Sequence, residues 1–279
     1  MIKNLLEIFS NNSRALEVLY LLDGIKKAVR LDASDLELMK IRNFCNKNKL
    51  YLEISDFKVV KIPDIGKGGY ANRSNRVPIS DPNGLHHIYI SKDENKAKFL
   101  KFLEHKKDDK AIGEILGYPN CCIEFFMQNK EKQQKMQNDF ILPALENSSG
   151  FEFLFYTNYA ARYFDAVLIS HFPHDFNCKE TIEIAKKNLN CIKSHSEELA
   201  IRLENILKSS ILYTEDDGIF VFEDFSFNNS ILQYKKIKST ISNNLFELLN
   251  KNKKLEVINK NTIKIENKII ENAGFMIFI

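Results

Sequence analysis

Hydrophobic residues recur at helical spacing along most of the first 210 positions, whereas residues 210–279 alternate between apolar and polar side chains. Helical spacing predicts helices over 2–10, 13–22, 34–44, 91–107, 111–116 and 177–209, with a further helix starting near Pro119. Runs of β-branched and aromatic residues predict strands at 50–54, 57–62, 86–90 and 275–279, and turn signals divide the rest of 210–279 into short strands and one helix near 244–249. These elements predict an α+β fold.

The predicted elements fall into three regions. Residues 1–92 predict a mixed α/β N-terminal lobe, 93–209 a central helical layer and 210–279 a small β-rich C-terminal lobe. We expect the polar stretch at 128–147 to be an exposed helix or an insertion. The aromatic stretch at 151–169 should pack as core around the central cysteines.

Local signals predict how three segments begin or turn. Ser34 is a candidate N-cap, and the Ser-x-x-Glu pattern at 91–94 predicts a capping box at the start of the next helix. The glycine-rich stretch at 63–84 predicts a long loop. It lacks the Gly-Lys-Ser/Thr ending of a phosphate-binding loop and has no helix directly after it, so we expect a mobile flap.

Composition and charge exclude several classes of protein. The chain is 44% hydrophobic and 28% charged, as in an ordinary globular protein, and Lys plus Arg exceed Asp plus Glu by only 40 − 37 = 3. We therefore expect no nucleic-acid partner. No apolar run approaches the ~20 residues of a membrane span. The N-terminus carries charges unlike those of a signal peptide, so we expect no membrane association and a cytoplasmic location.

Chemistry is concentrated in two short motifs. The first, at 117–126, reads Gly-Tyr-Pro-Asn-Cys-Cys-Ile-Glu-Phe-Phe, and the second, at 171–178, reads His-Phe-Pro-His-Asp-Phe-Asn-Cys. Together they hold three of the five cysteines and two of the six histidines. An odd number of cysteines in a chain too long to need disulfides favours reduced thiols that serve as ligands or redox groups.

Both motifs run into the predicted start of a helix. Pro119 suits a first helical position, which puts Cys121 and Cys122 in the first turn. Asn177, with Glu180 three residues later, predicts an N-cap that puts Cys178 at the first position of the next helix. The free N–H groups and the helix dipole there favour thiolate, which is the form that binds metals and acts as a nucleophile.

If the fold brings the motifs together, they supply five soft or borderline ligands. The predicted ligands are Cys121, Cys122, His171, His174 and Cys178. These donors suit a zinc ion, an iron–sulfur cluster, or a non-haem iron or copper site. Zinc and iron are the metals we expect. The spacing matches neither ferredoxins nor zinc fingers.

Other candidates are weaker. Glu124 and Asp175 are possible acid–base groups or supports for the ligands, and Tyr118 is a possible pocket residue. Cys191 and His195 lie four apart on one predicted helix, where a packed thiol beside a half-exposed imidazole is the simpler interpretation. His86 and His87 are adjacent on a strand and point to opposite faces, so they do not readily share a metal.

The two motifs resemble an uncharacterised archaeal and bacterial family catalogued as domain of unknown function 483. The resemblance rests on Gly-Tyr-Pro-x-Cys-Cys-x-x-Phe-Phe at 117–126 and on His-x-Pro at 171–173 followed by Cys178. It is clearest over about 85–190 and implies a site without an established reaction. The family pattern has cysteine at the position of His174, and histidine is also able to bind a metal.

The leading hypothesis is a metal- or iron–sulfur-binding protein that is an enzyme or the partner of one. It would act on a small-molecule or peptide substrate. One alternative is an accessory module that binds a peptide or protein and is held together by structural zinc. The other is a metal-free redox protein that uses the neighbouring thiols of Cys121 and Cys122.

Overall fold

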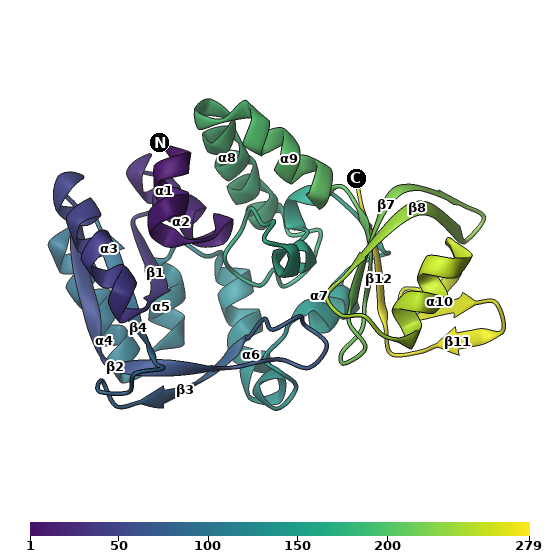
Figure 1. Cartoon of the computed structure of the whole chain (residues 1–279), viewed down its shortest axis with the longest axis horizontal. Helices are drawn as coiled ribbons and strands as arrows, with labels where there is room; N and C mark the ends of the chain where they lie inside the picture. Colours follow the sequence, from purple (N-terminus) through teal and green to yellow (C-terminus); the bar gives the residue numbers. More distant parts are fainter.

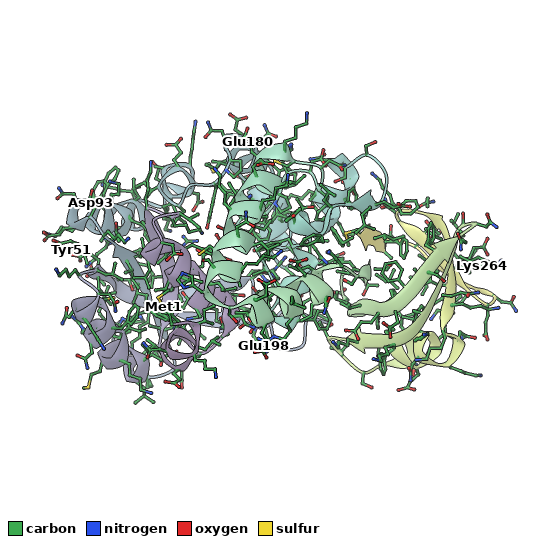
Figure 2. The ribbon with its side chains drawn as sticks, turned by 90° about the horizontal axis from the view of Figure 1, so that it is seen from above. Met1, Tyr51, Asp93, Glu180, Glu198 and Lys264 are labelled. Carbon is green, nitrogen blue, oxygen red and sulfur yellow. The ribbon has the colours of Figure 1, made fainter.

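The computed structural model describes all 279 residues and has the predicted α+β architecture. The molecule is elongated, with a mixed lobe at one end, helices in the middle and a β-rich lobe at the other end (Figure 1). Viewed from above, Tyr51 and Asp93 lie near one end, Glu180 and Glu198 near the middle, and Lys264 at the far end (Figure 2).

The N-terminal lobe is built on an antiparallel sheet of four strands in the order β1-β4-β2-β3. Its elements are α1 (Ile2–Phe9), α2 (Asn12–Leu22), β1 (Ala28–Ala33), α3 (Asp35–Lys47), β2 (Tyr51–Ile62), β3 (Arg73–Val77), β4 (Leu85–Ser91) and α4 (Glu94–Lys106). Alternate residues of β4 pack on different sides, with Ile88 and Ile90 in the main core and Tyr89 in a small cluster with α4.

The middle of the molecule is helical and carries both motifs. Its elements are α5 (Asp109–Ile115), α6 (Asn120–Lys135), α7 (Ile141–Asn147), the 3-10 helices η1 (Phe155–Thr157) and η2 (Ala160–Phe164), α8 (Lys179–His195) and α9 (Glu197–Leu207). As expected, the aromatic stretch before α8 packs into the core: Phe153 and Phe155 are buried, and Phe153 contacts Phe176 of the second motif.

The C-terminal lobe is an eight-stranded sheet in the order β11-β10-β9-β8-β7-β6-β12-β5. Its elements are β5 (Glu152–Phe153), β6 (Ser210–Tyr213), β7 (Ile219–Asn228), β8 (Ile231–Ser239), α10 (Asn244–Asn252), β9 (Lys254–Asn259), β10 (Thr262–Ile265), β11 (Lys268–Ile270) and β12 (Gly274–Phe278). Leu245 and Leu249 of α10 pack into the 14-residue cluster of this lobe.

The main hydrophobic core does not stop at the predicted region boundaries. This cluster of 46 buried residues includes Val29 and Ile90, Phe140 and Leu189, and Val221 and Phe278. It therefore takes side chains from the stretches 1–92, 93–209 and 210–279, so burial couples all three. The division at 92 and 209 stays a prediction.

Three local predictions are wrong in detail. The expected strands at 50–54 and 57–62 form one strand, β2, whose pairing with β4 shifts register between Ile54 and Lys58. The long helix expected at 177–209 divides at Ser196, whose hydroxyl caps α9. The capping box expected at 91–94 does not form, because Asp93 caps α4 through the N–H groups of Asn95 and Lys96.

The stretch at 63–84 is not a continuous loop, because it contains β3. Its glycine-rich tip is packed against the C-terminal lobe. Lys67 is 1% exposed and donates to the carbonyl of Thr214 (2.6 Å), and the carbonyl of Gly66 accepts from the hydroxyl of Thr240 (2.6 Å). A Cβ at Gly66, where φ is +72°, would stand 2.2 Å from the carbonyl oxygen of Asp216, so only glycine fits this close approach.

Candidate metal centre

The first motif places two cysteines at the start of α6. Gly117 follows α5 with φ +78°, and Pro119 is the N-cap of α6. Cys121 and Cys122 then lie in the first turn, and the carbonyl of Pro119 accepts from the N–H of Cys122 (3.0 Å). The predicted position of both thiols at a helix N-terminus is confirmed.

The second motif is a turn that ends at the N-terminus of α8. The N–H of Phe176 donates to the hydroxyl of Ser148 (2.9 Å), and the carbonyl of Phe176 accepts from the hydroxyl of Thr157 (2.7 Å). Cys178 is itself the N-cap of α8, with no side-chain cap, whereas the sequence predicted Asn177 in that place. The thiol of Cys178 faces both cysteines of the first motif and also accepts from the hydroxyl of Thr181.

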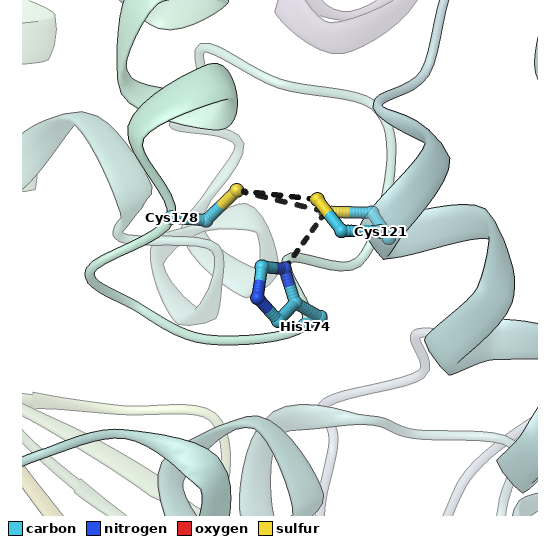
Figure 3. A group of neighbouring side chains, drawn as sticks. Cys121, His174 and Cys178 are labelled. Carbon is cyan, nitrogen blue, oxygen red and sulfur yellow. Dashed lines mark hydrogen bonds between the residues drawn. The ribbon is translucent and has the colours of Figure 1, made fainter.

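The two motifs meet at one point. Ligand atoms of Cys121, Cys122, His174 and Cys178 all lie within 4.8 Å of one another. The Sγ atom of Cys178 is 3.8 Å from that of Cys121 and 4.0 Å from that of Cys122. The Sγ atom of Cys122 is 3.6 Å from Nδ1 of His174, and the side chains converge from α6, the turn and α8 (Figure 3).

The three thiols do not share protons equally. Hydrogen bonding from Cys122, and further donation from Thr181 and Cys121, lower the pKa of Cys178 to about 4 against the cost of burial. The same contact with Cys178, together with burial, raises the pKa of Cys122. Burial and the neighbouring Cys178 raise the pKa of Cys121 to about 11. Cys178 is therefore the most readily ionised thiol of the group.

His171 lies beside this group but not within it. Its Nε2 atom is 2.9 Å from the hydroxyl of Thr181, which in turn donates to Sγ of Cys178 (3.2 Å). Burial, assisted by the positive charge of Lys26, lowers the pKa of His171 to about 3. A neutral imidazole with Nε2 protonated completes this chain, so His171 orients Thr181 towards the thiolate.

The three weaker candidates, Tyr118, Asp175 and Glu124, lie in different surroundings. The ring of Tyr118 lies 5.2 Å from that of His171. Asp175 accepts from the backbone N–H of Asn177 (2.6 Å), and Glu124 is exposed with no hydrogen bond or ion pair. Neither carboxylate belongs to the Cys/His group, so acid–base roles for them stay predictions.

Sequence reasoning missed two partners. Thr181 lies one turn into α8 and contacts both Cys122 and Cys178, and the interval of three residues from Cys178 was the available signal. Asp23 meets the pair Cys191 and His195, and no local pattern marks a residue so distant in sequence. His86 pairs with Asp35 and His87 with Asp32, which agrees with their separate faces.

A cavity of about 120 Å³ adjoins the group of four ligands. Cys122 and His171 form part of its wall, together with Tyr118, Arg30, Phe126 and Phe172. A small molecule in this cavity would therefore contact a cysteine of the group.

No helix is long and apolar enough to cross a membrane. Neither the curated proteins nor the solved structures contain a match to this chain. Residues 97–208, which include both motifs, match the family described as protein of unknown function DUF483, so the predicted resemblance to this family is confirmed over that stretch.

Proposed function

We propose that this chain is a zinc protein with a mononuclear centre formed by Cys121, Cys122, His174 and Cys178. The observation that carries the proposal is the spacing of the four ligand atoms. Tetrahedral zinc with bonds of about 2.3 Å to sulfur and 2.05 Å to nitrogen separates two sulfurs by about 3.8 Å and sulfur from nitrogen by about 3.6 Å. The three Sγ separations are 3.8, 4.0 and 4.0 Å, and the Cys122–His174 separation is 3.6 Å.

The spacing argues against an iron–sulfur cluster. In such a cluster the thiolates bind several irons, so the cluster holds most of them farther apart than one ion does. It also supports the metal site over redox chemistry of Cys121 and Cys122 alone. Their Sγ atoms are 4.0 Å apart, about twice the length of a disulfide bond, and both face Cys178.

Four protein ligands fill a tetrahedral shell, which is typical of structural zinc. The ligands come from α6, from the turn before α8 and from the N-cap of α8. We infer that the ion would join these three segments and fix the wall of the adjoining cavity. This function combines the accessory-module hypothesis with a binding site beside the centre.

A metal-dependent enzyme is the second candidate. It is favoured by one observation, namely that Cys122 lines the cavity and a metal would hold it as thiolate. Iodoacetamide added to zinc-loaded protein, followed by peptide mapping, tests this. Modification of Cys122 supports a nucleophile facing the cavity, and modification confined to the partly exposed Cys121 contradicts it.

Metal analysis of anaerobically purified protein tests the zinc centre itself. We expect about one zinc per chain. Replacement by Co²⁺ should give the intense visible bands of a tetrahedral ion bound to thiolate. Iron with sulfide-dependent absorption would contradict the proposal, and so would protein that binds neither zinc nor cobalt.

A further inference from the structure

Three cavities share wall residues, and the first of them borders the proposed centre at Cys122. The first, described above, has about 120 Å³; the second, between α2, β1 and η2, has about 220 Å³; the third, between the end of α5 and α8, has about 170 Å³. Tyr118 and Ser170 line all three, and Arg30 lines the first two. We call these three together the Tyr118 cavity.

Cations outnumber carboxylates on its walls. Six cationic side chains line it: Arg14, Lys26, Lys27, Arg30, Arg162 and Lys187. Three carboxylates do so: Glu17, Asp109 and Glu114. The whole chain is almost balanced, with 40 basic and 37 acidic residues, so this excess is local. A concave wall of this sign attracts anions.

Several of these cations keep donors that no protein group uses. Arg30 donates to Glu104 only through Nη1 (2.8 Å), and its side chain is 37% exposed. Arg162 is 3% exposed, and its Nε has no partner. Nε and Nη2 of Arg14 are also buried without partners. The side chains of Arg14 and Arg162 are 18% and 2% exposed, whereas that of Arg30 is 37% exposed, so the free donors of Arg30 are the ones that a ligand in the cavity can reach.

The remaining wall is aromatic and apolar. Tyr20, Tyr70, Tyr118 and Tyr159 line the second cavity, and Ile112, Ile123, Phe126 and Phe172 line the first. Lys26 lies over the ring of Tyr118 at 5.6 Å, but it is already engaged by Glu17 and Ser170. Arg30 is thus an open cation that lines the same cavity as Tyr118 and Cys122.

We propose that the Tyr118 cavity binds a small organic anion with a planar apolar part. The phosphate or carboxylate group lies at Arg30, and the apolar part lies against Tyr118 and the wall that contains Cys122. This inference names the class of ligand for the proposed function. It depends on the proposed metal centre only for the part of the wall that contains Cys122. Arginine suits either anion because its planar fork can donate two parallel hydrogen bonds.

Calorimetric titration of the zinc-loaded full chain tests the inference with three probes: phenyl phosphate, benzoate and benzyl alcohol. We expect an anion to bind and the neutral alcohol not to bind, and the tighter anion identifies the group that is recognised. Arg30→Gln should weaken binding at least about tenfold. Arg30→Lys, which keeps the charge but loses the fork, should lie between Arg30→Gln and the parent.

Arg76 offers a matched control. It also donates to Glu104, through Nη2 at 3.2 Å, but it does not line the Tyr118 cavity. Arg76→Gln should change binding less than about twofold. The inference is overturned if neither anion binds at about 10 mM. It is also overturned if benzyl alcohol binds as well as the anions do, or if both glutamine variants lose binding equally.

Zinc content measured on the same samples separates this inference from the proposed function. Anion binding without zinc refutes the metal centre and keeps the cavity. Zinc without anion binding refutes the cavity and keeps the centre.

Discussion

Helix α8 carries a cysteine group at each end, and the two groups differ. At its N-terminus Cys178 meets Cys121, Cys122 and His174. At its C-terminal end Cys191 and His195 meet Asp23, which caps α2. Both groups consist of residues that bind metals, so residue type alone does not distinguish them.

The distances do distinguish them. Oδ2 of Asp23 lies 3.1 Å from Sγ of Cys191 and 2.8 Å from Nε2 of His195. These are hydrogen-bond lengths, shorter than the edges of about 3.5 and 3.3 Å that tetrahedral zinc would impose on the same atoms. Four of the six separations at the N-terminal end are 3.6 to 4.0 Å, and none exceeds 4.8 Å. The C-terminal group is held together by hydrogen bonds, whereas the atoms of the N-terminal group lie far enough apart to surround an ion.

The helix ends explain part of the contrast. Free N–H groups and the positive end of the dipole favour thiolate at the N-terminus, and the pKa of Cys178 falls to about 4, chiefly through donation from Cys122. At the other end, burial and then Asp23 raise the pKa of Cys191 to about 12. The same side chain is therefore a candidate ligand at one end of α8 and a packed thiol at the other.

The largest expected effect comes from exchanging one cysteine at each end. Cys178→Ser should lower zinc from about one per chain to below about one tenth, and lower Tm by at least about 10 °C, because metal binding contributes to folding. Cys191→Ser should keep the zinc and lower Tm by less than about 3 °C. Elemental analysis and thermal unfolding measure both. Equal zinc loss in the two variants would remove the distinction.

The second effect is the release of protons when zinc binds. Near pH 8 Cys178 is already a thiolate, whereas Cys121, with a pKa of about 11, and Cys122, with a raised pKa, still hold protons. Zinc should displace about two protons, so the apparent affinity should rise with pH by about two decades per unit.

Calorimetry in buffers with different ionisation enthalpies counts these protons, and Cys191→Ser serves as the control with an unchanged count. A count near zero would mean that the three thiols are already ionised, which would contradict the raised pKa of Cys121 and of Cys122. Binding should fall more steeply below about pH 4, where Cys178 also takes up a proton.

A third effect concerns support of the thiolate. Thr181→Val removes the hydroxyl that donates to Cys178 and faces His171. Zinc affinity should fall about 10- to 100-fold, as is usual when a partner of a ligand is lost. Thr214→Val is a matched control, because its hydroxyl bonds only to the carbonyl of Gly218. Competition with a chelator of known affinity measures both variants.

The sequence predicted which residues are available as ligands, but not which of them lie within the Cys/His group. Pro119 fixed the start of α6, and the four residues that meet were all among the five predicted ligands. Helix starts are local properties, set by a few neighbouring residues, and so they can be read from the chain. His171 contacts the group only through Thr181. This position depends on how the turn packs, which a local sequence pattern does not predict.

The fold class was predictable for the same reason, and its connections were not. Alternation in 210–279 predicted strands, but the parallel pairing of β12 with β5 joins residues more than a hundred positions apart. We expected the glycine-rich tip at Lys67 to be mobile because glycine content indicates a flexible backbone. It does not indicate which residues the segment packs against. Its burial depends on Thr214 and Thr240, which lie in another lobe.

The smallest expected effect tests the C-terminal group directly. Asp23→Asn removes the charge facing His195 but keeps an oxygen that can accept from Cys191. The side chains of His195 and Asp23 are 25% and 30% exposed, so the free energy of unfolding should fall by only about 0.5–1 kcal/mol. Urea denaturation measures this, with Glu183→Gln, which breaks the exposed pair with Lys186 on the same helix, as the control.

Zinc content decides how this variant is interpreted. If Asp23 were a ligand, the parent would hold about two ions per chain and Asp23→Asn about one, because three donors with a neutral amide among them bind zinc poorly. An unchanged content near one ion, combined with the small loss in stability, means that Asp23 satisfies Cys191 and His195 by hydrogen bonds alone. The two ends of α8 then differ in function because only one of them leaves its donors at the spacing of a metal's coordination shell.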